Sequence, residues 1–325
     1  MEEEIFEQRT DLSKLNIAVE QIKATIAKII VGQQESIDLL IAGILADGHI
    51  LIEGVPGVAK TLTAKLIAKS IEAKYSRIQF TPDLMPSDIL GTSVFNPKTA
   101  DFEFKHGPIF GNIILIDEIN RAPAKTQSAL FEVMEERQLT IDGKTYKMEE
   151  PFTVLATQNP VEHEGTYRLP EAQLDRFMFK IEIKYPSLDE EIAIITRQHQ
   201  HKTTDQLNEV TSVLSGSDIG ALRQQVLAFH VDEKLLIYVA KIIHESRNNK
   251  SLYLGGSPRA SLAIVNSAKA IAAIKGRDFI TPDDIIYVAA PVLRHRIMLT
   301  PEKEMEGVTP DDVIAQLIQK IEVPR

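Results

Sequence analysis

Residues 54–61 combine the residue types that a phosphate-binding loop needs. They read Gly-Val-Pro-Gly-Val-Ala-Lys-Thr and lie between an apolar run and an expected helix. In a loop of this kind, successive backbone N–H groups point at phosphate oxygens, the lysine reaches the β- and γ-phosphates, and the hydroxyl binds Mg²⁺. Ala59 stands where the general pattern has a second glycine, but Gly57 still allows close backbone approach. We therefore expect a nucleotide phosphate site here.

Two carboxylates follow an apolar run about 55 residues downstream. Residues 112–116 read Asn-Ile-Ile-Leu-Ile and run into Asp117 and Glu118. An aspartate at the carboxyl edge of a sheet can hold a Mg²⁺ that bridges phosphates, and an adjoining glutamate can polarise an attacking water. A strand that ends in acids is common and indicates little alone. In this order after the phosphate loop, it indicates hydrolysis of a nucleoside triphosphate.

Three further polar residues are candidates for the same chemistry. Asn159 follows an expected strand and could position the attacking water, although Asn-Pro is also an ordinary turn. Arg176 precedes the last expected strand and could equally be a surface residue or an ion-pair partner. Arg259 lies in the first turn of an expected helix, where a cation opposes the helix dipole. That cost hints at an anionic partner such as a phosphate.

Short apolar runs alternate with helical patterns in the first part of the chain. Runs of this kind suit strands that are covered on both faces, as in a parallel sheet, and helices are expected between them. The chain is therefore predicted to be a doubly wound α/β fold. The expected strands are residues 49–53, 75–80, 112–116, 152–156 and 177–183, with helices at 13–30, 35–45, 60–71 and 124–136.

The pattern changes after Tyr185-Pro186, where only helical periods remain. A chain of 325 residues suggests about two domains. We predict an α/β domain over residues 1–188 and a smaller all-α domain over residues 189–325. The expected helices of the second domain are residues 192–200, 218–228, 232–244, 258–274, 282–292 and 310–321. The basic segment 294–296 between the last two is expected to be a solvated helix end.

Composition narrows the class of protein. The net charge of −10 argues against a broad basic surface for nucleic acid, and the 6% aromatic content argues against binding by base stacking. The absence of cysteine excludes disulfides and thiolate metal sites. The acidic start does not read as a signal peptide, and the apolar runs are too short for a membrane helix. A cytoplasmic protein with no membrane segment is expected.

Taken together, the motifs resemble those of the MoxR family of AAA+ ATPases. The resemblance covers nearly the whole chain from residue 30 onwards, and the alanine at position 59 is the residue that this family's loop usually carries. It implies an AAA+ P-loop NTPase core with a parallel sheet, followed by a smaller all-α lid domain. The motifs that carry the resemblance are residues 54–61, 115–121, 156–160, 170–177 and 256–260.

The resemblance also implies a role for each candidate residue, with ATP and Mg²⁺ as cofactors. Glu118 matches the catalytic acid, Asn159 sensor 1, and Arg259 sensor 2, acting on its own or a neighbouring nucleotide. Arg176 matches the arginine finger that reaches the neighbouring subunit. Thr61 and Asp117 match the Mg²⁺ partners. The nucleotide-binding residues are Val31 and Gly32 near the adenine and Gly54, Val55, Pro56, Gly57, Val58, Ala59, Lys60, Thr61 and Leu62 around the phosphates.

Two inserts complete the resemblance. Residues 91–107 read as a hairpin with a turn at Asn96-Pro97, and residues 139–146 read as a hairpin with an Asp142-Gly143 turn. In MoxR-like proteins such elements are the helix-2 insert and the pre-sensor-1 hairpin, which are thought to face the ring pore or the substrate. Ordinary surface hairpins are the alternative.

The family resemblance predicts a hexameric homo-oligomeric ring that uses ATP to remodel or mature a protein client. A partner with a von Willebrand factor A domain is implied by the family alone. Three alternatives fit the same motifs: a magnesium-chelatase-type motor subunit, a DNA-directed AAA+ motor, and a nucleotide switch or scaffold that does not hydrolyse ATP. The acidic net charge argues against the DNA motor, and the complete set of Lys60, Asp117, Glu118 and Arg176 argues against the scaffold.

Overall fold

A five-stranded parallel sheet forms the centre of the N-terminal part of the chain. The computed structural model describes residues 11–324, apart from 56, 160–166 and 201–209. The strand order is β10-β1-β9-β6-β3, so neighbouring strands are far apart in the sequence. All five predicted strands are found. They are β1 (His49–Gly54), β3 (Tyr75–Gln79), β6 (Ile113–Asp117), β9 (Thr153–Gln158) and β10 (Phe177–Ile183).

The sheet is apolar on both faces because helices cover both of them. In β6 every residue is buried, and successive side chains enter different cores. Ile113 and Leu115 pack into the first core, whereas Ile114 and Ile116 pack into the second. This alternation follows from the pleat of a strand and explains the continuous apolar run.

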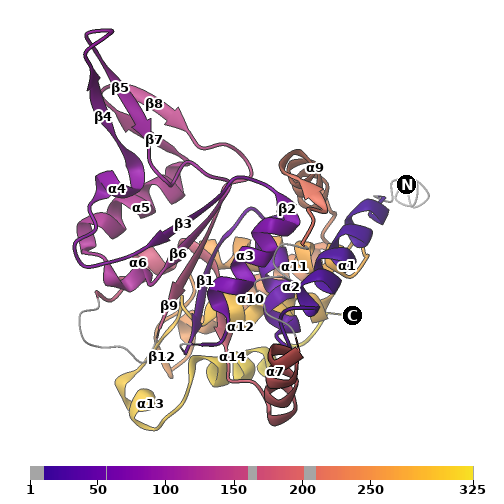
Figure 1. The fold of residues 1–325 in the computed structure, drawn as a ribbon. Helices are drawn as coiled ribbons and strands as arrows, with labels where there is room; N and C mark the ends of the chain where they lie inside the picture. Colours follow the sequence, from indigo (N-terminus) through magenta and orange to yellow (C-terminus); the bar gives the residue numbers. More distant parts are fainter. Residues whose placement is uncertain (1–10, 56, 160–166, 201–209, 325) are drawn as a thin grey trace, which may run out of the picture.

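Different helices cover the two faces (Figure 1). The first core includes side chains of α1 (Ser13–Ala27), α2 (Gln34–Leu45) and α3 (Lys60–Ser70). The second includes side chains of α5 (Ala124–Glu136) and α4 (Pro86–Leu90). Shorter elements connect these layers: β2 (Ile71–Glu72), the 3₁₀ helix η2 (Ile119–Arg121) and α6 (Glu171–Leu174).

The C-terminal part is mostly helical, as predicted. It also contains short strands that the sequence pattern did not predict, because two or three residues are too few to show a period of two. They are β11 (Leu214–Ser215), paired with β2, and the antiparallel pair β12 (Leu252–Leu254) and β13 (Met298–Leu299). The helices are α7 (Leu188–Gln200), α9 (Gly216–Leu227), α10 (Glu233–Asn248), α11 (Pro258–Ile274), α12 (Pro282–Leu293), α13 (Pro301–Met305) and α14 (Pro310–Lys320).

The helical part packs tightly against the sheet layer. Helix α11 packs on α2, and α12 packs on β10, so that a single core runs across both parts. The division between residues 188 and 189 therefore stays a prediction. Within the described part of the chain, no helix is both long enough and apolar enough to cross a bilayer.

Two hairpins project together from one end of the molecule (Figure 1). The strands of the first are β4 (Gly91–Asn96) and β5 (Asp101–His106), and those of the second are β7 (Gln138–Ile141) and β8 (Lys144–Lys147). Both predicted hairpins are thus found. They contact each other through the rings of Phe104 and Tyr146, whose centroids are 4.6 Å apart.

Candidate active site

The carboxyl edge of the sheet gathers the residues that were expected to bind and cleave a nucleotide. Because the strands are parallel, β1, β6 and β9 all end at this edge. Lys60 and Thr61 begin the helix that follows β1, Asp117 and Glu118 lie at the end of β6, and Asn159 follows β9. The structure therefore brings these five residues together from three separate segments.

The phosphate loop turns sharply between β1 and α3. Gly57 and Ala59 have φ values of +88° and +58°, so both lie in the left-handed region. This conformation is free for glycine and costs an alanine about 1–2 kcal/mol. A Cβ atom at Gly57 would meet no other atom within 4 Å, so space is open beside the loop. Pro56 lies outside the described residues.

The ammonium of Lys60 connects the loop to β9. It donates to the carbonyl oxygen of Gly54 and, at 3.1 Å, to that of Gln158. Burial lowers the pKa of Lys60, while the negative charges of Glu118, Glu53 and Asp117 oppose that shift. The charge of Lys60 therefore lies where the phosphate loop and the ends of β6 and β9 meet.

Asp117 and Thr61 form a small cluster of oxygen ligands. Thr61 Oγ1 donates to Asp117 Oδ1 at 3.0 Å, and Thr157 Oγ1 lies 3.3 Å from the same oxygen. The other carboxylate oxygen accepts from Arg77 Nε at 2.7 Å. One carboxylate and one hydroxyl are the donors that suit Mg²⁺, which keeps several waters and phosphate oxygens rather than an all-protein cage. The described residues include no group of three or more His, Cys, Asp or Glu side chains that could hold a metal ion.

Glu118 occupies an unusual backbone position directly after β6. Its φ of +58° is left-handed, its side chain is 45% exposed, and its backbone N–H donates to Thr157 Oγ1 at 3.1 Å. The carboxylate accepts from Gln79 Nε2 at 3.2 Å and lies 3.6 Å from Arg121 Nε. The side chain is thus oriented toward the sheet edge and partly open to water.

Arg77 and Gln79 belong to the site but were not predicted as site residues. Both alternate with buried Ile78 on β3, which pairs with β6 so that Gln79 lies opposite Asp117. The only available signal was two polar side chains in a short strand, which is the pattern of any half-exposed strand. Their role depends on the strand order, and the sequence does not specify that order.

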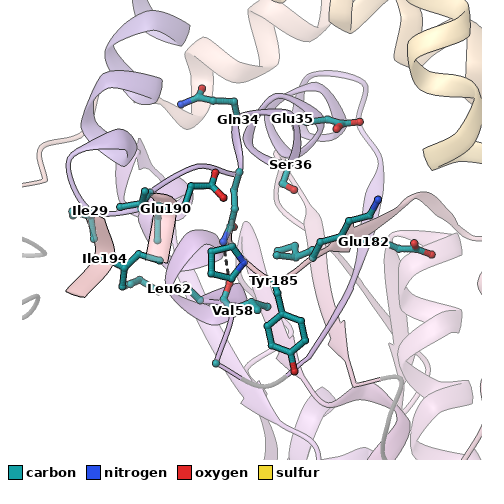
Figure 2. A pocket seen from close by; sticks show the side chains of 18 residues that line it. Ile29, Gln34, Glu35, Ser36, Val58, Leu62, Glu182, Tyr185, Glu190 and Ile194 are labelled. Atoms are coloured by element: carbon teal, nitrogen blue, oxygen red, sulfur yellow. Dashed lines mark hydrogen bonds between the residues drawn. The ribbon is translucent and has the colours of Figure 1, made fainter. Parts of the chain in front are cut away.

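A cavity of about 440 Å³ lies beside the phosphate loop (Figure 2). Its walls come from residues 29–36, from the loop and start of α3, and from residues 182–194. Val31, Gly57, Val58, Ala59 and Leu62 line it, whereas Gly32, Gly54, Val55, Lys60 and Thr61 do not. Apolar side chains such as Ile29, Leu62 and Ile194 and polar ones such as Gln34 and Glu190 line it together, and a concave site of this size can hold a flat heterocycle.

Gly32 lies at the edge of this cavity, under the start of α7. Its φ is +70°, and a Cβ atom there would lie only 2.0 Å from Glu190 Oε1. Glu190 is fixed by the N–H of Ser187, which donates to its other oxygen at 2.8 Å. A side chain at position 32 would therefore have to displace the carboxylate of Glu190 and adopt a left-handed backbone conformation. The next residue, Gln33, donates to the carbonyl oxygen of Val58 at 3.2 Å and connects this wall to the phosphate loop (Figure 2).

Arg176 and Arg259 lie at the opposite edge of the sheet. Arg176 precedes Phe177, which pairs with His49 at the start of β1, whereas the phosphate loop follows the end of β1. At about 3.3 Å per residue, six residues of β1 separate the two edges by about 20 Å. Arg259 Nη2 donates to Glu135 Oε1 at 2.6 Å, and Arg176 Nε lies 3.4 Å from Glu135 Oε2. The structure thus brings the two arginines together, but away from the other five candidates.

The basic segment 294–296 is not the solvated helix end that the sequence suggested. His295 and Arg296 are buried, and Arg296 donates through Nε to Asp175 at 2.7 Å. The expectation was wrong because the segment packs under the start of β10. His295 Nε2 contacts the carbonyl oxygen of Phe177 there at 2.9 Å.

Comparisons with known proteins agree over both parts of the chain. Residues 49–179 match the family described as "ATPase family associated with various cellular activities (AAA)", and residues 244–317 match an AAA lid domain. The predicted fold class, an AAA+ core with a parallel sheet followed by a smaller helical lid, is confirmed.

Three individual proteins show how far the similarity extends. The chain is 45% identical over 310 residues, or 95% of each chain, to the uncharacterized protein YeaC of Bacillus subtilis. It is 44% identical over 309 residues to Chaperone MoxR1 of Mycobacterium tuberculosis, covering 92% of this chain and 81% of that one. A crystal structure of a candidate ATPase from Cytophaga hutchinsonii superposes with a TM-score of 0.86 at 41% identity, covering 96% and 98% of the two chains.

Proposed function

The chain belongs to the MoxR family of AAA+ ATPases and hydrolyses ATP, and we propose that each ATP is bound between adjacent subunits of a hexameric ring. One observation carries this proposal. Lys60, Asp117 and Glu118 lie at the carboxyl edge of the sheet, whereas Arg176 and Arg259 lie at the amino edge about 20 Å away. An arginine side chain cannot span that distance, which supports a second copy as the source of the arginines.

Within one subunit, the residues at the carboxyl edge would bind the nucleotide. The adenine would occupy the cavity beside Val31 and Gly32, and the backbone N–H groups of residues 54–62 would hold the phosphates with Lys60. Thr61 and Asp117 would hold Mg²⁺, which neutralises phosphate charge when bound. This assignment is supported by the 3.0 Å contact between their oxygens.

Glu118 and Asn159 would act on the attacking water. Glu118 is placed to accept its proton, since the carboxylate is partly exposed next to Asp117. Asn159 follows the neighbouring strand and would orient the same water. From the adjacent subunit, Arg176 would stabilise the charge that develops on the transferred phosphoryl group, an effect worth roughly 10³–10⁵ in rate in related NTPases. Arg259 would act beside it, in trans.

We propose further that the ring is a cytoplasmic chaperone for a protein client, with a partner that carries a von Willebrand factor A domain. The name of the Mycobacterium relative supports the chaperone activity. The paired hairpins offer a surface for the client, because Phe95 and Phe102 are 52% and 62% exposed near their end. Large exposed aromatic side chains are typical of surfaces that bind other proteins.

Mixing of subunits tests the interface. Arg176→Ala lacks the finger but keeps its own phosphate site, whereas Glu118→Gln keeps the finger but lacks the acid. Each variant alone should turn over ATP slowly. In mixed rings, some interfaces join an intact phosphate site to an intact finger, so turnover should rise above the sum of the two. No rise at any ratio, in rings shown by light scattering to contain both variants, would contradict an arginine that acts across an interface.

A further inference from the structure

One carboxylate holds both arginines of the amino edge. Glu135 lies in the last turn of α5, Arg176 between α6 and β10, and Arg259 in the first turn of α11. Arg259 Nη2 donates to Oε1 at 2.6 Å, whereas Arg176 Nε lies 3.4 Å from Oε2 in an ion pair without a hydrogen bond. Three segments that are far apart in the sequence therefore meet at a single side chain.

The close approach of Arg176 and Arg259 depends on the negative charge of Glu135. Two guanidinium groups that converge on one point repel each other, and Arg259 is also disfavoured by the dipole of α11, whose first turn contains no acidic residue. The carboxylate of Glu135 offsets both effects. Without it, the two long side chains would regain rotamer freedom and would separate.

The backbone around Arg176 is fixed by other residues, so that Glu135 controls mainly the side chain. Asp175 accepts from Arg296 Nε at 2.7 Å and from Ser257 Oγ at 3.2 Å, which ties the finger segment to the lid. The guanidinium of Arg176 lies 5.9 Å from the centre of the Phe131 ring. The direction of the guanidinium is therefore set by the Phe131 ring on one side and by the carboxylate of Glu135 on the other.

The cluster is open to solvent. Side-chain exposures are 54% for Arg259, 34% for Glu135 and 29% for Arg176. Glu135 and Arg176 line a surface hollow of about 210 Å³. With two guanidinium groups and one carboxylate, these three side chains have a net charge of +1. Glu132 and Glu136 also line this hollow, so an anionic group from outside would reach the cluster at Arg259, the most exposed of the three side chains.

We propose that Glu135 is a positioning residue for the reaction: it holds Arg176 and Arg259 side by side so that both reach the triphosphate of the adjacent subunit. The inference rests on the proposed interface. Glu135 does not touch the nucleotide of its own subunit, because it lies at the amino edge of the sheet. Its effect on turnover should therefore be exerted entirely on the neighbouring site.

The variant Glu135→Gln tests this role, because it keeps the size of the side chain but removes its charge. We expect kcat to fall about tenfold to a hundredfold, the range that follows from misplacing a catalytic group by about 1 Å. The affinity for ATP, measured with a fluorescent analogue, should change less than about threefold. Glu132→Gln is the matched control, since Glu132 lies one turn earlier on α5 and makes no ion pair with another described residue. It should keep the wild-type kcat.

Mixing experiments separate this role from a merely structural one. Glu135→Gln subunits keep their own phosphate site, so Glu118→Gln subunits, which supply an intact Glu135 and both arginines, should restore turnover. Arg176→Ala subunits should not, because neither variant then supplies a working finger. Rescue also shows that the Glu135→Gln subunit is folded.

The outcomes distinguish the two proposals. A wild-type kcat for Glu135→Gln, when Arg176→Ala is impaired and rescued by Glu118→Gln, would overturn the role of Glu135 and leave the interface intact. Failure of Glu118→Gln to rescue Glu135→Gln would also overturn it. If Arg176→Ala itself turned over ATP at the wild-type rate, both proposals would be contradicted.

Discussion

The two edges of the central sheet are built in different ways. At the carboxyl edge, Asp117 is 6% exposed and shares hydrogen bonds with Thr61 and Arg77. At the amino edge, Arg259 is 54% exposed and its contact is an ion pair with Glu135 at the surface. Exposed ion pairs contribute little to stability, typically 0–1 kcal/mol. The first edge is thus buried within one chain, whereas the second stays partly open to solvent and to an adjacent subunit.

This difference explains why one chain holds two incomplete halves of a site. Groups that bind phosphates directly need fixed positions, and the sheet provides them because three strands end together. Groups that act on a neighbour have to remain accessible until the neighbour arrives. A partly exposed carboxylate between two arginines meets that need, since it orients them without burying them.

The largest expected effect is at the carboxyl edge. Lys60→Ala should abolish ATP binding, because the ammonium is the only side-chain cation of the same subunit that is assigned to the phosphates. Glu118→Gln should still bind ATP but should lose turnover by about 10²–10⁴, the usual contribution of general acid–base catalysis. Nucleotide binding by equilibrium dialysis and steady-state release of phosphate measure the two effects. Equal ATP affinities for the two variants would contradict the division of roles.

Most site residues of the carboxyl edge could be predicted from the sequence, whereas the contacts of the amino edge could not. Residues 54–61 and 117–118 are local motifs, and every contact they need lies within a loop or at the end of a strand. Glu135 could not be predicted in the same way, because its partners lie on segments that meet only after α5, α11 and β10 have packed. The sequence also left open whether Arg259 acts on its own or a neighbouring nucleotide, because that depends on where the lid docks.

A smaller effect, on stability, is expected at the amino edge. His49 is fully buried there: Nδ1 accepts from the N–H of Val154 at 3.0 Å, and Nε2 donates to the carbonyl oxygen of Met134 at 3.1 Å. Both nitrogens are satisfied only in the neutral ring. Burial, helped by the charge of Arg137, lowers the pKa of His49 to about 3, and burial also lowers the pKa of His295 well below its ordinary value.

The depressed pKa values of His49 and His295 determine how the stability of the fold changes with pH. The unfolded chain binds protons at these histidines below about pH 6.5 and the folded chain does not, so stability is lost as the pH falls. The free energy of unfolding should drop by up to about 1.4 kcal/mol per pH unit for each histidine below pH 6.5. Urea titrations between pH 7.5 and 5.5 measure this change in the free energy of unfolding. This pH range lies above the one in which carboxylates titrate. His49→Gln should remove about half of this dependence, and an unchanged slope would contradict the assignment.

The smallest effect is expected from Ala59→Gly, which restores the glycine of the general phosphate-loop pattern. The left-handed conformation of Ala59, with φ of +58°, costs about 1–2 kcal/mol, whereas glycine loses about 0.5–1 kcal/mol more conformational entropy on folding. The two terms partly cancel, so the free energy of unfolding should rise by no more than about 1.5 kcal/mol. The KM for ATP should change less than about twofold if the methyl group only borders the cavity that it lines. A tenfold increase in KM would instead mean that the nucleotide packs directly on this methyl group, and the carboxyl edge would then select its ligand through Ala59 as well as through Lys60.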